Sequence, residues 1–282
     1  MSGPQGVTVG DGKMAVVDKL AHRVLIYNEM LVSGAPAPIP AVVIGQPNFD
    51  TTGSACGAGG LSSPSAAMIT SQGQLIVADT VNHRVLIWDS VPEDQVQAAS
   101  PDRVLGQASV DDCFENGGAT PSGETFSLPS DVWSDGTRLV VADSGNHRVL
   151  IWNQFPTADG QSAEVVLGHS DFFNMNPNNG VDPFDSGTPS NSTFHSPGGV
   201  HSDGTRLAVT DIANNRVLIW DNFPSVNLQA AGFVIGHLNF NQRVTDGPKS
   251  QTLSAPSRAL LTADSVIVSD TNRNRVLVYR RK

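Results

Sequence analysis

One phrase occurs five times along the chain, and this internal repeat constrains the fold more than any other feature. It reads HRVLIY at 22–27, NHRVLIW at 82–88 and 146–152, NNRVLIW at 214–220 and RNRVLVY at 273–279. Upstream of each copy stand a proline, a short segment, a turn such as SDGT, and an apolar stretch that ends in Asp. Downstream, the first four copies close with VVIGQ, RVLGQ, VVLGH or FVIGH. A repeat of this kind indicates one supersecondary unit that is stacked several times.

Each copy predicts four β-strands. The first follows the proline, the second ends in Asp, the third is RVLIW and the fourth is V(V/L)(L/I)G. The Asp-Gly of SDGT suits a tight hairpin, because glycine adopts positive φ without strain. RVLIW does not alternate between apolar and polar residues, so we expect it to be buried on both faces, as in a sheet between two others. Repeated four-stranded antiparallel units are the blades of a β-propeller, and we predict an all-β, five-bladed β-propeller.

The repeats divide a single domain, residues 1–282, into five blades. Their bounds are about 1–60, 61–125, 126–193, 194–252 and 253–282. The last copy ends at RVLVYRRK, so blade 5 is expected to lack its outer, fourth strand. Either it is three-stranded with an exposed edge, or a segment has been removed. The charges of Arg280, Arg281 and Lys282 discourage pairing between edges and favour the first alternative.

The sequence resembles a known repeat family. The pattern V-x-D-x-x-N-H-R-V, seen as VADTVNHRV and VADSGNHRV, is similar to the NHL repeat. Together with VLGQ and a nearby phenylalanine (Phe49, Phe172 and Phe240), it resembles a bacterial NHL subfamily with long blades. The resemblance covers all five copies and implies a propeller, although NHL propellers commonly have six blades. Family members range from RNA-binding and protein-binding modules to a peptide-amidating lyase, so the fold does not select the function.

The polar residues of the repeated phrase are predicted to be structural, because a catalytic residue is needed once and a structural one in every blade. We expect the Asp that ends the second strand to accept backbone N–H bonds in the turn. The Arg is expected to pair with this Asp or with a neighbouring blade. The members of this repeat box include Asp79, His83, Arg84, Asp143, His147, Arg148, Asp211 and Arg216.

Function is sought where the copies differ, and the connections between blades differ most. They span 45–64, 106–129, 168–197 and 236–256, on the face that also carries the turns between second and third strands. Long loops on a rigid scaffold are the usual place for binding. Their apolar contact residues are Phe114, Phe172, Phe173 and Phe184. The alternative is that these loops are solvent-exposed connectors that pack on themselves.

Three ionisable residues that do not recur are expected at the mouth of the central channel: Asp131, His195 and Arg258. An acid, a base and a cation that converge there would suit a small polar ligand or acid–base chemistry. The plainer reading, which we favour, is an Asp131–Arg258 ion pair that plugs the channel, with His195 on a surface loop. A tetrahedral zinc site needs three or four ligands, and only His195 and His201 lie near a first strand. No cofactor is predicted, and a structural metal ion in the channel stays open.

Composition limits the partners and the compartment. The formal net charge of −10, from 27 acidic and 17 basic residues, argues against nucleic acid and against an anionic membrane surface. No apolar run approaches the length of a membrane span. Cys56 and Cys113 lie in Gly-rich loops, either free or joined in a disulfide. A disulfide would suit an extracellular or periplasmic location. No signal peptide precedes the patterned sequence, which suggests a trimmed start.

Three functions compete on this basis. The leading one is a non-enzymatic, monomeric interaction module that binds a protein, peptide or glycan through the long-loop face. The second is a metal-assisted lyase or hydrolase of the peptide-amidating-lyase type, acting at the channel mouth. The third is a structural module within a larger secreted protein, without a ligand of its own.

Overall fold

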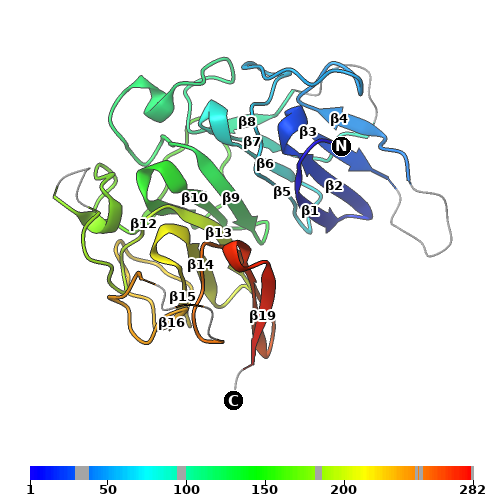
Figure 1. Cartoon of the computed structure of the whole chain (residues 1–282). Coiled ribbons are helices and arrows are strands. Elements are labelled where there is room, and N and C mark those ends of the chain that lie inside the picture. Colours follow the sequence, from blue (N-terminus) through cyan, green and yellow to red (C-terminus); the bar gives the residue numbers. More distant parts are fainter. Residues whose placement is uncertain (29–37, 94–99, 182–185, 245–246, 248–249, 281–282) are drawn as a thin grey trace. The chain divides into compact units, whose positions relative to one another are not determined.

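The computed structural model describes residues 1–28, 38–93, 100–181, 186–244, 247 and 250–280. These residues form short antiparallel strands, joined by turns and by single 3-10 turns (Figure 1). They contain no α-helix. None of the helical turns in this part of the chain has the length and apolar character that crossing a membrane requires.

The strands fall into four sets, one for each position within a blade. The first strands are β1 (Pro4–Gly10), β5 (Ala66–Ile69), β9 (Pro129–Ser134), β13 (Pro197–Ser202) and β17 (Pro256–Leu261). The second strands are β2 (Lys13–Asp18), β6 (Leu75–Asp79), β10 (Leu139–Asp143), β14 (Leu207–Asp211) and β18 (Ser265–Asp270). The third strands are β3 (Arg23–Tyr27), β7 (Arg84–Trp88), β11 (Arg148–Trp152), β15 (Arg216–Trp220) and β19 (Arg275–Arg280). The fourth strands are β4 (Val42–Ile44), β8 (Arg103–Leu105), β12 (Val165–Leu167) and β16 (Phe233–Ile235).

Each sheet follows the order of the chain, which makes every blade a simple meander. Four sheets have four strands, and the fifth contains only β17, β18 and β19 among the described residues. The fold is therefore an all-β, five-bladed β-propeller, as the repeat predicted. Blade 5 lacks a fourth strand in this part of the chain, also as predicted. Arg281 and Lys282, two of the charges expected to protect its edge, lie outside the described residues.

The chain forms two compact units, and their boundary runs through blade 3. Unit 1 comprises residues 1–139 and 153–162, and unit 2 comprises residues 140–152 and 163–282. In unit 1 the first strand β5 contacts β1 on one side and β9 on the other. In unit 2 the first strand β13 contacts β17. Adjacent blades within a unit thus meet through their first strands.

The hairpins have the conformation that their sequence predicted. Gly136 and Gly204, the glycines of the two SDGT turns, have φ of +86° and +92°, which a side chain at Cβ would disfavour. Ser134 supports the first of these turns, because its hydroxyl donates to the Arg138 carbonyl and accepts the Gly136 N–H. The turn thus satisfies its own polar groups beside a buried sheet.

The core consists of the faces that neighbouring blades turn toward each other. In unit 1, Val24 and Ile26 of blade 1 join Leu86 and Trp88 of blade 2 in one buried cluster. The third strands β7, β11 and β15 are buried along their whole length. These apolar runs therefore lie between two layers, and burial of their side chains on both faces stabilises the stack of blades.

Short 3-10 turns join the second and third strands and orient the repeat box. They are η1 (Lys19–Ala21), η2 (Thr80–Asn82), η4 (Ser144–Asn146), η6 (Ile212–Asn214) and η7 (Thr271–Arg273). Two more, η3 (Glu115–Gly118) and η5 (Pro177–Asn179), lie in the long loops.

An Asp–Arg ion pair spans each of the five box turns, and the Asp side chain is fully buried in all of them. In blade 2, one oxygen of Asp79 accepts Arg84 Nε at 2.8 Å and Asn82 Nδ2 at 2.7 Å. The other oxygen accepts the Ser62 N–H at 2.6 Å. Burial raises the pKa of Asp79 to about 6, against the opposing effect of these three donors. The carboxylate is thus still ionised at neutral pH, and charge-assisted hydrogen bonds satisfy it.

The residue after each of the five box turns has the same backbone conformation, and in blades 1 to 4 it links one blade to the next. It adopts left-handed φ between +50° and +57°, and it is His in three blades and Asn in two. Its ring nitrogen or amide oxygen accepts the N–H of the residue that precedes the next blade's proline. These blade-to-blade latches are His22 Nδ1 with Ser63 (2.9 Å), His83 Nδ1 with Leu128 (3.2 Å), His147 Nδ1 with Ser196 (3.0 Å) and Asn215 Oδ1 with Ala255 (2.9 Å).

The depth of burial of the box predicts how much each arginine contributes to stability. Arg148 and Asp143 are both fully buried, whereas the Arg275 side chain in blade 5 is 27% exposed and Arg273 lies 4.0 Å from the same Asp270. We expect Arg148→Ala to lower the free energy of unfolding by about 3–5 kcal/mol, because it leaves a buried carboxylate unpaired. The matched Arg275→Ala should cost about 1 kcal/mol. Urea unfolding followed by tryptophan fluorescence measures both, and equal losses would contradict this assignment.

Candidate functional site on the long-loop face

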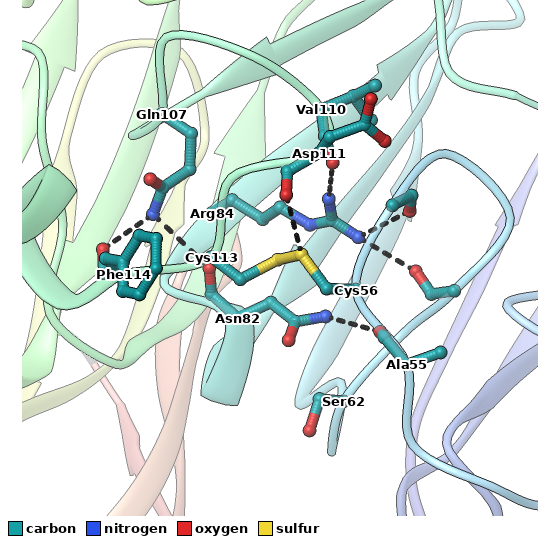
Figure 2. The surroundings of a disulfide bond; sticks show 12 residues. Ala55, Cys56, Ser62, Asn82, Arg84, Gln107, Val110, Asp111, Cys113 and Phe114 are labelled. Atoms are coloured by element: carbon teal, nitrogen blue, oxygen red, sulfur yellow. Dashed lines mark hydrogen bonds between the residues drawn. A yellow bond between two sulfur atoms is a disulfide. The ribbon is translucent and has the colours of Figure 1, made fainter.

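The box arginine of each blade also holds the long loops. In blade 2, Arg84 Nη2 donates to the carbonyls of Gly57 (3.0 Å) and Gly60 (2.9 Å), which belong to the loop before the blade. Its Nη1 donates to the Val110 carbonyl, in the loop after the blade. Figure 2 shows the guanidinium between these two loops. One buried side chain therefore fixes both loops to the blade.

A disulfide joins the same two loops. Cys56, in the loop 45–64, is bonded to Cys113, in the loop 106–129, and the two residues are 57 positions apart. The Cys56 sulfur lies 3.2 Å from the Asp111 carbonyl oxygen (Figure 2). Both loops belong to unit 1. The covalent bond and the Arg84 hydrogen bonds thus act on one pair of segments.

Amide side chains complete the anchoring of these loops. Asn82 Nδ2 donates to the Ala55 carbonyl at 2.9 Å. Gln107, from the VLGQ motif, donates through Nε2 to the carbonyls of His83 (3.1 Å) and Phe114 (2.8 Å). The backbone at 114 is therefore fixed from inside the blade. The Phe114 side chain is nevertheless 68% exposed.

Acidic residues surround this exposed aromatic ring in the sequence. The segment 111–115 reads DDCFE, with Asp111 and Glu115 exposed and Asp112 half-buried. The Glu115 carboxylate accepts the Ser127 hydroxyl at 2.6 Å, which holds it near the base of the loop. We define residues 111–115 as the Phe114 segment. It combines an exposed apolar ring with carboxylates that neighbour it in the sequence, on an anchored backbone. The sequence prediction named Phe114 without these carboxylates.

Unit 2 carries a second pair of loops with a similar support. Arg216 donates to the Thr193 carbonyl at 2.8 Å and to the Phe240 carbonyl, so it joins the loops before and after blade 4. Arg243 of the later loop donates to Ser186 Oγ and, at 3.4 Å, to the Gly187 carbonyl of the earlier one. Phe173 is as exposed as Phe114, whereas Phe172 is half-buried and its carbonyl accepts Arg148. Phe184 lies outside the described residues.

The three residues predicted at the channel mouth lie in or next to three different first strands. Asp131 is buried in β9 and belongs to unit 1, whereas His195 and Arg258 belong to unit 2. Arg258 stands in the first strand β17, paired with Ser269. His195 precedes β13, and its backbone N–H donates to Asp211 at 2.8 Å. Convergence of all three at one site stays a prediction.

His195 takes part in the junction between blades 3 and 4. Its ring meets the ring of His147 edge to face, with 5.2 Å between ring centroids. Burial lowers the pKa of His147 to about 4, and nearby His195 and His169 add to this effect. Burial also lowers the pKa of His195 and of His169. These rings are therefore neutral at pH 7, as the latch requires, because His147 Nδ1 must accept the Ser196 N–H.

The described residues contain no group of three or more His, Cys, Asp or Glu side chains placed to hold a metal ion. His201, the other histidine near a first strand, accepts the Leu261 N–H through Nδ1 at 3.1 Å. It thus contributes to the contact between blades 4 and 5.

Comparison with known proteins supports the fold. No family model matches the sequence, and no curated protein matches it. A chain in the crystal structure of a nidogen/laminin complex is similar to 98% of this chain over 75% of its own length, with 13% identity and a TM-score of 0.52. A chain in the crystal structure of the mitotic checkpoint complex is similar to 98% of this chain over 63% of its own length, with 10% identity and a TM-score of 0.51. At these identities the likeness concerns the fold alone.

The pKa of His147 predicts a loss of stability in acid. The neutral form is favoured in the folded state, so its contribution is complete above the unfolded pKa of 6.5 and is lost as the pH falls toward about 4. Asn215 performs the same latch in blade 4 without titrating. We therefore expect His147→Asn to remain folded at pH 7.5. Between pH 7.5 and 4.5 its free energy of unfolding should fall by about 2 kcal/mol less than that of the unsubstituted protein. Denaturant unfolding at both pH values gives the difference, and identical pH dependence would rule out this role.

The disulfide predicts a second effect on stability. Closing a loop between residues 57 positions apart restricts the unfolded chain, and the chain-entropy model sets this contribution near 4 kcal/mol. The double variant Cys56→Ser/Cys113→Ser should lower the free energy of unfolding by about 2–4 kcal/mol. Reductant should destabilise the unsubstituted protein by the same amount and leave the double variant unchanged. A reductant effect on the double variant would point to another cause.

Proposed function

We propose that this protein is a non-enzymatic propeller of the NHL type that binds a protein, peptide or glycan partner through its long-loop face. The observation that carries this proposal is the Phe114 segment. Its aromatic ring is exposed although the Arg84 hydrogen bonds, the disulfide and Gln107 all hold its backbone. An exposed ring on a fixed backbone loses less conformational freedom on binding than one on a mobile loop, which is the property of an interface anchor.

The chemistry of the segment favours a cationic peptide segment over the other partner classes. Asp111, Asp112 and Glu115 flank the ring with negative charge, and the whole chain carries a formal net charge of −10. Lys or Arg of a partner would meet these carboxylates, while an apolar side chain would cover the ring. The same charge disfavours RNA, whose phosphates need a basic surface.

The fold gives general support to a binding role. The similar solved chains come from structures described as a nidogen/laminin complex and as the mitotic checkpoint complex, both assemblies of proteins. We propose an extracellular or periplasmic location as well, because disulfides persist in oxidising compartments. No observation on the described residues favours the alternative of a metal-assisted lyase or hydrolase.

Selection from a random 12-residue peptide library displayed on phage tests this function on the intact protein. We expect enrichment of peptides that combine Lys or Arg with an apolar residue. Phe114→Ala should lower the affinity for the selected peptides by tenfold or more. Asp111→Asn/Asp112→Asn should lower it severalfold, and this second loss should be smaller at high salt. Val7→Ala is the matched control, since Val7 is 66% exposed and lies in the first strand β1, outside the long loops. Selected peptides that tolerate Phe114→Ala would refute the assignment.

A further inference from the structure

Two segments of the long loop 106–129 run antiparallel beside each other. The Asn116 N–H donates to the Phe126 carbonyl at 2.9 Å. One residue further along, the Ser127 hydroxyl donates to the Glu115 carboxylate at 2.6 Å. In this register each step back along the first segment is matched by a step forward along the second. The next residues of the two segments therefore lie near each other as well.

Phe114 and Leu128 are the next residues in this register, and they are 68% and 41% exposed. A second connection also brings them together. Gln107 Nε2 donates to the carbonyls of Phe114 and His83, and His83 Nδ1 accepts the Leu128 N–H. Both blades that the loop connects are complete four-stranded sheets, so no missing strand accounts for this exposure. We define Phe114 and Leu128 as the apolar pair.

The same two positions carry small or polar residues in two other long loops. The equivalent backbone bond joins Ala55 to Leu61 in the loop before blade 2, and Asn178 to Phe194 in the loop before blade 4. Both loops form this bond without apolar residues at the positions of the pair, so the fold does not require them. The residues at these positions are Gly53 with Ser63, and Asn176 with Ser196.

Leu128 also has a backbone conformation that disfavours leucine. Its φ is +49°, in the left-handed region, where a bulky side chain is strained. The equivalent residues Ser63, Ser196 and Ala255 have φ of +47°, +56° and +49°. Leu228 has positive φ too, but its side chain is half-buried. A strained, exposed leucine that the turn does not need indicates a functional constraint.

Glu115, the residue after Phe114, supplies a negative charge at the apolar pair. It is exposed, and its bond to Ser127 holds the carboxylate beside the neighbour of Leu128. Most described Lys and Arg side chains are already ion-paired within the chain. The cation that pairs with Glu115 is therefore expected on a partner protein.

We infer that the apolar pair and Glu115 bind one short motif of a partner protein: a large apolar residue with Lys or Arg one or two positions away. The apolar side chain lies against both Phe114 and Leu128, and the cation reaches Glu115. Contact on two sides favours Leu, Met or Phe over Ala, because more apolar surface is removed from water. The inference rests on the proposed function and deepens it by assigning the selection of the apolar residue to Leu128.

Fluorescent peptides titrated into the intact protein test this inference by anisotropy. The probes are GSRLRSG, GSRARSG and GSELESG, which differ in the central apolar residue and in the charges beside it. We expect GSRLRSG to bind about tenfold more tightly than GSRARSG, because the longer side chain removes more apolar surface from water. GSELESG should not bind. Leu128→Ser should abolish the preference for GSRLRSG over GSRARSG, while both peptides still bind.

Urea unfolding separates binding by Leu128 from a structural role. The midpoint for Leu128→Ser should be unchanged or higher, because Ser has the same backbone conformation at the equivalent places before blades 2 and 4. A lower midpoint would assign Leu128 to the stability of the fold and would overturn the inference. Val226→Ser, at a side chain that is 58% exposed between β15 and β16, is the matched control and should keep the full preference.

The outcomes distinguish this inference from the proposed function. A preference for GSRLRSG that survives Leu128→Ser but is lost with Phe114→Ala would overturn the inference and leave the proposed function standing. Absence of saturable binding by the three probes would also overturn the inference alone, since the phage selection tests the function separately. Dimerisation in analytical ultracentrifugation that Leu128→Ser abolishes would assign the apolar pair to a second copy of the chain, and would overturn the choice of a different protein.

Discussion

The buried ion pair between the Asp that ends each second strand and the Arg that begins each third strand is the interaction on which the other features depend. Removing both charges from water is costly, and the cost is offset only because every donor and acceptor is used. Nε of the arginine binds the carboxylate, while its remaining N–H groups bind carbonyls of the long loops. The pair therefore joins the turn, the blade and the long loops in one hydrogen-bonded unit.

This arrangement separates the constant part of each blade from the variable part. Arg84 and Arg216 contact loops only through backbone carbonyls. Because every residue type supplies a carbonyl, the side chains of the loops are free to differ between copies without loss of the anchor. The disulfide adds a covalent constraint in unit 1, and the loops of unit 2 use Arg243 instead. Loops with different side chains are thus anchored by the same Asp–Arg hydrogen bonds inside each blade.

Most of the fold was predictable because the same sequence pattern occurs five times along the chain. The four strands of blades 1 to 4, the SDGT hairpins and the three-stranded sheet in the described part of blade 5 all follow from aligned copies. The role of the histidine position was not predicted, since its partner is a backbone N–H with no side-chain signature. The sequence did contain one indication of this role: the position is His in three copies and Asn in two. Both residues tolerate left-handed φ, and both place a hydrogen-bond acceptor at a similar distance from the backbone. The carboxylates next to Phe114 in the sequence could not be singled out from the sequence, because nothing in the repeat distinguishes them and the hydrogen bonds that anchor the loop are visible only in the structure.

The blade-to-blade latch joins one blade to the next, but it does not determine how many blades the propeller has. Its acceptor lies in one blade and its donor is a main-chain group at the start of the next, with His and Asn interchangeable on one side and Ser, Leu or Ala on the other. Nothing in this contact records which repeat is first, third or last. A chain built on such junctions can gain, lose or reorder whole repeats and keep every junction chemically the same. Repeat count is then set by packing geometry alone, which makes this architecture well suited to growth by duplication of a single segment.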